Sequence, residues 1–284
     1  MTALNLIEHP LAGTPFGLAL DLCLILAVAV WLLSVLTRDY SLVDNLWSLL
    51  PPVYCLIVAA HADFDSARVN VMTALVIAWS ARLTFNHARK DGYRLRNMDY
   101  RWAYTREKLG PVGFQVLNIT FIAPVQMLLI WLFTSPVHQA WLGQETPLGW
   151  LDFLAAALFV VLFVGEATGD EQMWRFQQDK KRRLAGGETV TEPFISTGLF
   201  RYCRHPSYFC ELGMWWVFYL FAVAASGQWL NWTVFGVVLL TALLIGSTRI
   251  TEAISAAKYP GYRDYQAATF ALIPLPRPQR TDEP

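Results

Sequence analysis

Long apolar runs separated by short polar segments dominate the chain. Each run is long enough to cross roughly 30 Å of hydrocarbon as a helix. The runs cover residues 15–36, 42–60, 69–87, 112–133, 148–167, 208–225 and 229–247. This pattern predicts an all-α integral membrane protein with seven transmembrane helices. We expect Pro124 to kink the fourth helix, and the fifth to continue as a polar helix to Lys181.

Lys and Arg gather in the loops on one side of these predicted spans. Segments 88–111 and 168–206 hold seven basic residues each, whereas 61–68 holds one and 135–147 and 226–228 hold none. Cytoplasmic loops of membrane proteins carry the excess of basic residues. We therefore expect the two basic loops and the C-terminus in the cytoplasm, and the N-terminus outside.

The composition supports the membrane class, because 55% of the residues are hydrophobic and only 15% are charged. No basic region precedes the first apolar run, so we expect that run to stay in the mature protein. The four cysteines show no C-x-x-C spacing, which predicts neither disulfides nor a metal site. Residues 1–284 contain no repeat or linker and are expected to form a single membrane domain, with membrane lipids and not nucleic acid as partners.

The stretch 198–211 carries the densest chemistry in the chain, with the sequence GLFRYCRHPSYFCE. Pro206 disfavours helix at His205, and Ser207 is a good N-cap residue. We therefore expect a helix to start at Ser207 and to carry Glu211 on its first turns. Its N-terminus would direct backbone N–H groups and a positive dipole end toward an anion.

Arg201 and Arg204 lie just before this predicted helix and are the candidates to hold that anion. Arg82, near the cytoplasmic end of the third apolar run, is a further candidate. Arginine suits phosphate because its planar fork donates two hydrogen bonds at once. The alternative is that the basic residues, above all those at 180–183, only set the membrane topology.

Asp44 lies near the start of the second apolar run, where an ionisable side chain is expensive and often marks a functional site. In a dry pocket its charged form is disfavoured, so the acid can stay protonated and donate to a substrate carbonyl, with Asn45 beside it. The alternative is a simple helix cap at the interface, made by Ser41 or by Asp44.

Glu166 and Asp170 share one face of the helix that leaves the membrane after the fifth run. Two acids four residues apart repel one another unless each has a donor partner. Either this face is solvated, or it hydrogen-bonds a cofactor or pairs with the basic loops. The tail tyrosines 259, 262 and 265 recur every three residues, which favours packing against the bundle.

Together these residues resemble a known family. Gly198–Tyr202, Arg204–Glu211, the Asp170 helix and Tyr259–Tyr262 are similar to the C-terminal domain of the steroid 5-alpha-reductase family. The chain resembles more closely the bacterial multi-pass branch of that family, long catalogued as a domain of unknown function. The pattern of that branch includes an Asp-x-x-Trp at the second span, present here as Asp44–Trp47.

The resemblance covers most of residues 40–275 and implies an oxidoreductase of lipid metabolism in the bacterial cytoplasmic membrane. Such an enzyme binds NADPH in a cavity facing the cytoplasm. It reduces a carbon–carbon double bond conjugated to a carbonyl in a lipophilic substrate, steroid-like or another lipid, that enters from the bilayer. Residues 1–110 would then form the substrate side and 111–284 the cofactor-binding half.

Asp170, Ser207 and Glu211 fall on the cofactor-binding acidic, Asn and Glu positions of the family. Arg82 and an arginine of the 94–101 loop fall near its phosphate-binding arginines. The resemblance and the residue pattern together give one set of expected cofactor-binding residues: Arg82, Arg94, Arg101, Asp170, Arg201, Tyr202, Arg204, His205, Ser207, Glu211, Glu252 and Tyr262.

The expected catalytic residues are Asp44 and Asn45, which stand where the steroid reductases have a Gln-Glu pair. The tyrosine of those enzymes in the third span falls near Trp79 here, and their Asn and Gly in the C-terminal motif are replaced by Ser207 and Cys210. Asp44 is therefore the expected carbonyl anchor or proton donor.

The segment Arg204–Tyr208, followed by Glu252 and Tyr259–Tyr262, also resembles membrane isoprenylcysteine carboxyl methyltransferases, which bind S-adenosylmethionine. The Asp170 helix and Asp44–Trp47 favour the reductase. So does the abundance of arginines, because S-adenosylmethionine carries no phosphate. A third alternative is a non-catalytic lipid-binding or transport protein, which would bind no cofactor tightly.

Overall fold

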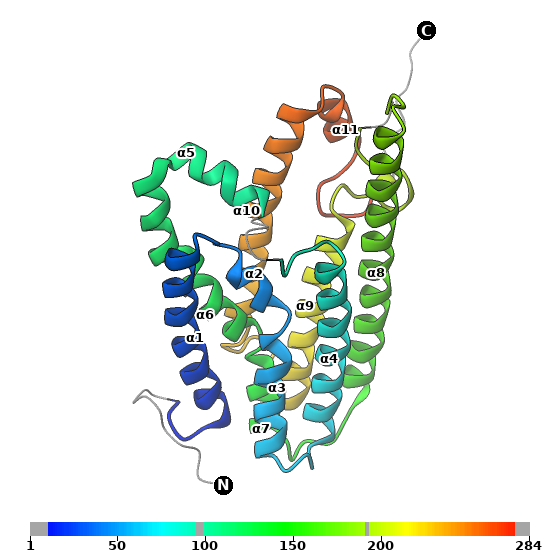
Figure 1. The fold of residues 1–284 in the computed structure, drawn as a ribbon. Helices are drawn as coiled ribbons and strands as arrows, with labels where there is room; N and C mark the ends of the chain where they lie inside the picture. Colours follow the sequence, from blue (N-terminus) through cyan, green and yellow to red (C-terminus); the bar gives the residue numbers. More distant parts are fainter. Residues whose placement is uncertain (1–10, 95–98, 191–192, 276–284) are drawn as a thin grey trace. The chain divides into compact units, whose positions relative to one another are not determined.

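The computed structural model describes residues 11–94, 99–190 and 193–275, and these residues form helices joined by turns, with no strand among them (Figure 1). The all-α architecture expected from the apolar runs is confirmed in this part of the chain.

The chain forms two compact units. Unit 1 comprises Met1–Phe159 and Trp215–Leu240, and unit 2 comprises Val160–Met214 and Thr241–Pro284. Three long helices contribute residues to both units: α8 (Trp150–Ala185), α9 (Pro206–Ser226) and α10 (Val234–Lys258).

Unit 1 contains the elements that come before α8 in the chain. They are α1 (Pro15–Thr37), α2 (Leu42–Trp47), α3 (Leu50–His61), α4 (Ala67–Ala88), α5 (Tyr100–Leu117), the π-helix η1 (Asn118–Ile122), α6 (Pro124–Phe133) and α7 (Pro136–Leu142). Helix α3 packs against α4, and α1 packs against α6. Large apolar side chains fill the interior: Trp79 stands edge-on to Trp215 with ring centroids 5.0 Å apart, and both are fully buried.

Helix α5 is broken at Gly110, where φ is +70°, and Figure 1 shows its two segments at an angle. Pro111 follows, and it disfavours the helical conformation at the residue before it. The expected kink at Pro124 takes another form, because the chain makes a π-helix up to Ile122 and α6 then begins at Pro124.

A buried ion pair joins α4 to the start of α8. The Arg68 and Asp152 side chains are 2% and 3% exposed, with Nε and Oδ1 2.7 Å apart. Arg68 also donates to the carbonyls of Thr146 and Pro147, each at 3.0 Å. The charge of each partner is therefore compensated inside unit 1.

Six helical stretches of the described residues are long and apolar enough to cross a membrane, which indicates a multi-pass membrane protein. They are Pro15–Thr37, Leu42–His61, Tyr100–Leu142, Trp150–Ala185, Pro206–Ser226 and Val234–Lys258. The third predicted span forms the helix α4, but it is not among the six. Its sequence carries Arg68, Arg82 and two asparagines, so it is less apolar than the others.

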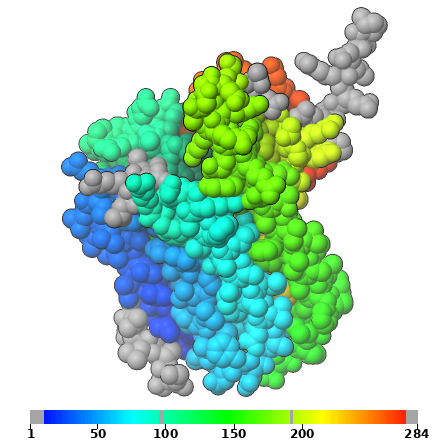
Figure 2. Space-filling view, turned by 45° about the vertical axis from the view of Figure 1, so that its right-hand side comes forward, coloured from blue at the N-terminus to red at the C-terminus, as the bar shows by residue number. Residues whose placement is uncertain are grey.

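Unit 2 contains the second part of α8, η2 (Gly198–Arg201), the first turns of α9, the end of α10 and α11 (Tyr262–Ala268). Helices α8 and α9 approach closely through small residues. A Cβ atom at Gly165 would lie 2.9 Å from Cys210 Sγ, and one at Gly169 would lie 2.9 Å from Ser207 Oγ. Residues 181–189 are all exposed, and this end of α8 lies at the surface (Figure 2).

The C-terminal segment of unit 2 pairs with the chain just before α9. Arg204 N donates to Phe270 O at 2.9 Å, and His205 N donates to Ala271 O at 3.0 Å. The tail tyrosines pack, as their spacing indicates, because the Phe194 ring contacts those of Tyr259, Tyr262 and Tyr265 at centroid distances of 5.9, 5.2 and 5.5 Å.

Candidate functional site

Glu252 on α10 is the centre of a polar cluster in unit 2. Arg204 donates two hydrogen bonds to the Glu252 carboxylate, from Nε to Oε1 at 2.6 Å and from Nη2 to Oε2 at 3.0 Å. His205 Nε2 lies 3.1 Å from Oε1, and Gln266 Nε2 donates to Oε2 at 3.0 Å. Arg204 Nη1 donates to the carbonyls of Gln266 and Thr269. With Arg204 9% and Glu252 13% exposed, the cluster is largely withdrawn from water.

The structure thus brings together three of the predicted cofactor-binding residues, Arg204, His205 and Glu252, but directs them at one another. All three nitrogens of the Arg204 guanidinium donate to protein acceptors. In this state Arg204 anchors α10 and the C-terminal segment. Arg201 and Tyr202 differ, because both side chains are exposed at the surface of unit 2.

A second polar group lies where α8 meets α9. Ser207 Oγ donates to Asp170 Oδ1 at 3.2 Å, and Glu211, one turn further along α9, is 6% exposed. Glu166, one turn before Asp170 on α8, is 3% exposed. The expectation that Ser207 caps the helix is wrong, because α9 begins at Pro206 and Ser207 lies inside its first turn. That position leaves the hydroxyl free to reach across to α8.

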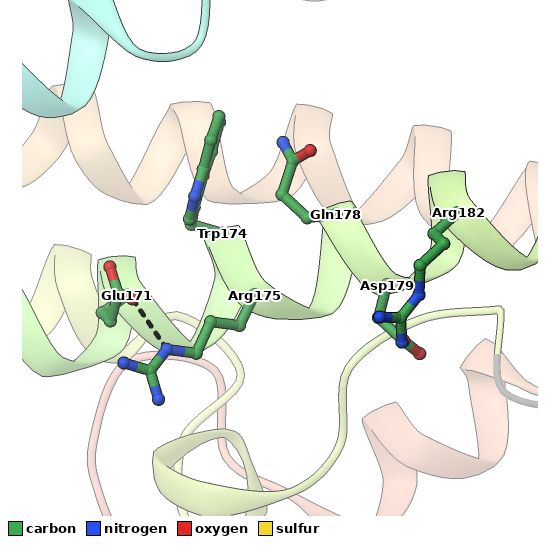
Figure 3. A pocket seen from close by; sticks show the side chains of 6 residues that line it. All are labelled: Glu171, Trp174, Arg175, Gln178, Asp179 and Arg182. Atoms are coloured by element: carbon green, nitrogen blue, oxygen red, sulfur yellow. Dashed lines mark hydrogen bonds and ion pairs between the residues drawn. The ribbon is translucent and has the colours of Figure 1, made fainter.

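The open face of α8 carries a groove of about 530 Å³ (Figure 3). Its lining side chains are Glu171, Trp174, Arg175, Gln178, Asp179 and Arg182. Trp174 and Gln178 point to the same side of the helix, and the dashed line in Figure 3 marks the bond from Arg175 Nε to Glu171 Oε1, 2.7 Å long. Arg182 pairs with Asp179 in the same way. The arginines of this face therefore already have carboxylate partners.

The predicted catalytic pair lies on α2 in unit 1. Asp44 Oδ2 accepts a hydrogen bond from Trp102 Nε1 at 3.0 Å. Asn45 Oδ1 lies 2.8 Å from His87 Nε2. Neither Trp102 nor His87 is among the residues that the sequence pattern singled out. Both lie in or beside the basic loop, whose charges were interpreted only as topology and phosphate contacts.

The predicted arginines of unit 1 have different surroundings. Arg101 is paired with Asp99, Nε to Oδ1 at 2.8 Å, and Arg94 is exposed in the turn after α4. Arg82 is half-buried on α4. Arg96, another arginine of this loop, lies outside the described residues.

Potential metal ligands and thiols are the other reactive groups among the described residues. No group of three or more His, Cys, Asp or Glu side chains gathers there that could hold a metal ion. The four cysteines are free and buried. Burial raises the pKa of the Cys203 thiol to about 11, so this thiol is not a ready nucleophile.

Comparison with known proteins places the chain in a family. The chain belongs to the family described as "Protein of unknown function (DUF1295)", which matches residues 30–269. It is similar to the uncharacterized protein C594.04c of Schizosaccharomyces pombe (strain 972 / ATCC 24843), with 35% identity over 285 residues, 95% of this chain and 83% of the relative. No solved structure matches it.

Proposed function

We propose that the protein is a membrane enzyme that binds NADPH and reduces a carbon–carbon double bond conjugated to a carbonyl in a lipophilic substrate. The proposal includes seven transmembrane helices, with α4 as the third, and a cofactor site that faces the cytoplasm. The resemblance to the steroid 5-alpha-reductase family motivates it, and one observation supports it: the contact between Asp170 and Ser207, one turn from the buried Glu211.

The donors and acceptors of this group fit the polar part of a nicotinamide nucleotide. Two carboxylates and a hydroxyl suit ribose hydroxyls or a carboxamide, which offer N–H and O–H donors. They would repel phosphate, which has to be held elsewhere. Arg201 of unit 2 is exposed, so we assign phosphate binding to Arg201. Arg204 holds Glu252 in place and so contributes to cofactor binding only indirectly.

When bound, NADPH supplies the hydride that forms the new C–H bond at the β-carbon and is released as NADP⁺. Asp44, protonated, donates to the carbonyl oxygen, where the electrons of the double bond arrive. The resulting enol returns its proton to Asp44 as the α-carbon takes a proton from water. One hydride and one proton are thereby added to the substrate.

The first test is the melting temperature of the detergent-purified protein with NADPH, NADH or S-adenosylmethionine. A ligand that binds only the folded state at a hundred times its Kd stabilises it by about 2.7 kcal/mol. We expect NADPH to raise the melting temperature, and Asp170→Asn to diminish that shift. Asp179→Asn is the matched control, because Asp179 lies on the same helix but pairs with Arg182 on the outer face. No shift with NADPH would refute the proposal.

The second test is NADPH oxidation in the presence of a panel of lipophilic enones. Asp44→Ala is expected to abolish turnover while the thermal shift with NADPH stays. Retained turnover would remove Asp44 from the mechanism.

A second candidate function is a methyltransferase that uses S-adenosylmethionine, as in isoprenylcysteine carboxyl methyltransferases. It is favoured by the contact of Arg204 and His205 with Glu252, since these are residues on which that resemblance depends. A thermal shift with S-adenosylmethionine alone would support it and exclude the reductase.

A further inference from the structure

The first turns of α2 and α5 lie side by side in register within unit 1. Asp99, just before α5, donates its backbone N–H to Oγ of Ser41, just before α2, at 2.8 Å. Three residues further along both helices, Trp102 Nε1 donates to Asp44 Oδ2 at 3.0 Å. Two contacts one turn apart fix how the two helix starts are paired, so the fold itself holds Trp102 and Asp44 in position for their hydrogen bond.

Trp102 is also held from its other side. Its ring packs against the apolar cluster of Tyr40, Phe114 and Ile122, whose members are at most 3% exposed. Asp99, the other carboxylate near this helix start, is engaged by the side chain and the backbone N–H of Arg101, each at 2.8 Å. The indole N–H of Trp102 therefore has a fixed position, with the carboxylate of Asp44 as its acceptor.

This bond decides where a proton on Asp44 lies. An indole N–H can only donate, so Oδ2 of Asp44 has to act as the acceptor. In a neutral carboxyl group the carbonyl oxygen is the better acceptor and the other oxygen carries the hydrogen. A protonated Asp44 consequently holds its proton on Oδ1.

His87 fixes the neighbouring amide in the same manner. Asn45 Oδ1 can only accept, so the His87 Nε2 at 2.8 Å has to carry a hydrogen. The turn after α4 closes tightly on this ring, since a Cβ at Gly92 would overlap His87 Nε2. The oxygen of Asn45 is thus occupied, and its NH₂ group is the part of the amide left for a ligand.

We propose that Trp102 and His87 are positioning residues that present Asp44 Oδ1–H and Asn45 Nδ2–H together, as a double hydrogen-bond donor for a carbonyl oxygen of the substrate. This inference rests on the proposed reductase function and narrows it. The substrate is a ketone or another carbonyl compound that accepts two hydrogen bonds at one oxygen.

The test is infrared spectroscopy of the purified full-length protein without substrate. The wild-type spectrum minus that of Asp44→Asn is expected to show a carboxylic acid C=O stretch at mildly acidic pH. Trp102→Phe keeps an aromatic ring in the apolar cluster but removes the N–H, so the band is expected to shift to higher frequency. Trp150→Phe, at a residue that is 71% exposed, is the matched control and leaves the band in place.

Nitrogen NMR of protein labelled at its five histidines tests the part of the proposal that concerns His87 and Asn45. The signal lost in His87→Gln is expected to be that of a neutral ring protonated at Nε2. If Trp102→Phe does not fold, benzothienylalanine at position 102, with sulfur in place of the N–H, gives the same comparison.

An absent carboxylic band, a band that Trp102→Phe leaves unmoved, or a His87 ring protonated only at Nδ1 would each overturn the inference. None of these measurements involves NADPH. A failed thermal shift with NADPH would therefore refute the reductase function separately, and these readouts would still decide how the pair is oriented.

Discussion

Arg204 provides a direct test of whether the motif around it is structural or binds a ligand itself. Replacing Arg204 by Met removes the bidentate ion pair with Glu252 and leaves His205 and Gln266 as the remaining partners of the carboxylate. Removing one partner of a buried ion pair costs about 3–5 kcal/mol. The carbonyls of Gln266 and Thr269 lose their donor as well. We expect the C-terminal segment of unit 2 to open far more often.

Cys203 is a built-in reporter of that opening. Its side chain is 1% exposed, and Sγ donates to Ala271 O at 3.2 Å, so the C-terminal segment covers it. The measurement is the rate of maleimide labelling in a chain whose Cys23, Cys55 and Cys210 are replaced by Ala. If labelling requires local opening, a loss of about 3–5 kcal/mol raises its rate roughly a hundredfold to several thousandfold, at about 1.4 kcal/mol for each factor of ten.

Two further variants separate the explanations. Arg175→Met is the matched control, because Arg175 also pairs with a glutamate in unit 2 but is 78% exposed, and labelling should not change. Combining Arg204→Met with Glu252→Leu removes both charges and should restore part of the protection. Unchanged labelling in Arg204→Met, together with a lost NADPH shift, would refute the structural role and make Arg204 a direct cofactor ligand.

Three other outcomes follow from the structure. Asp152→Asn leaves the Arg68 charge uncompensated at 2% exposure and should lower stability by about 3 kcal/mol or more, whereas an Arg68→Met/Asp152→Leu pair should cost less in a double-mutant cycle of unfolding midpoints. Burial raises the pKa of the Cys203 thiol from 9.0 to about 11, so this thiol ionises in the unfolded chain at a lower pH than in the folded protein. The free energy of unfolding of the wild type should therefore fall between these two pH values more steeply than that of Cys203→Ala. Gly169→Ala puts a methyl group 2.9 Å from Ser207 Oγ and should weaken the NADPH-dependent thermal shift with little change in the melting temperature of the protein alone; an unaltered shift would argue against a role for this contact.

The helices could be predicted from the sequence wherever a long apolar run defines them. The run 15–36 corresponds to α1, Pro15–Thr37, and the polar continuation of α8 ends at Ala185, just before Gly187 with φ +76°. Helices outside apolar runs were missed, such as α11 and the first segment of α5. They are short and amphipathic at best, and their stability comes from tertiary contacts that a local pattern does not contain.

The candidate site could be predicted in its residue types but not in its pairings. Asp44 was singled out because an ionisable side chain in a membrane span is expensive, Arg204 as a candidate anion ligand before a predicted helix, and Glu252 through the family resemblance. Each of these charges requires compensation by a partner. Which partner provides it depends on contacts between segments 48 residues apart for Arg204 and Glu252, and 58 apart for Asp44 and Trp102. The phosphate assignment of Arg204 overlooked a carboxylate of the same chain as the nearer anion.

The close contact of α8 with α9 restricts how the family can diverge. A Cβ atom at Gly165 or Gly169 would lie 2.9 Å from a side-chain tip of α9, Cys210 Sγ or Ser207 Oγ, so that side chain would have to move to accommodate it. Substitution at these two positions is therefore expected to be limited to glycine, and to alanine where the facing side chain on α9 can shift. Lipid-facing residues such as Val161, 66% exposed, can exchange freely among apolar types. Distant members should therefore keep small residues four apart on this helix long after the rest of its apolar surface has changed.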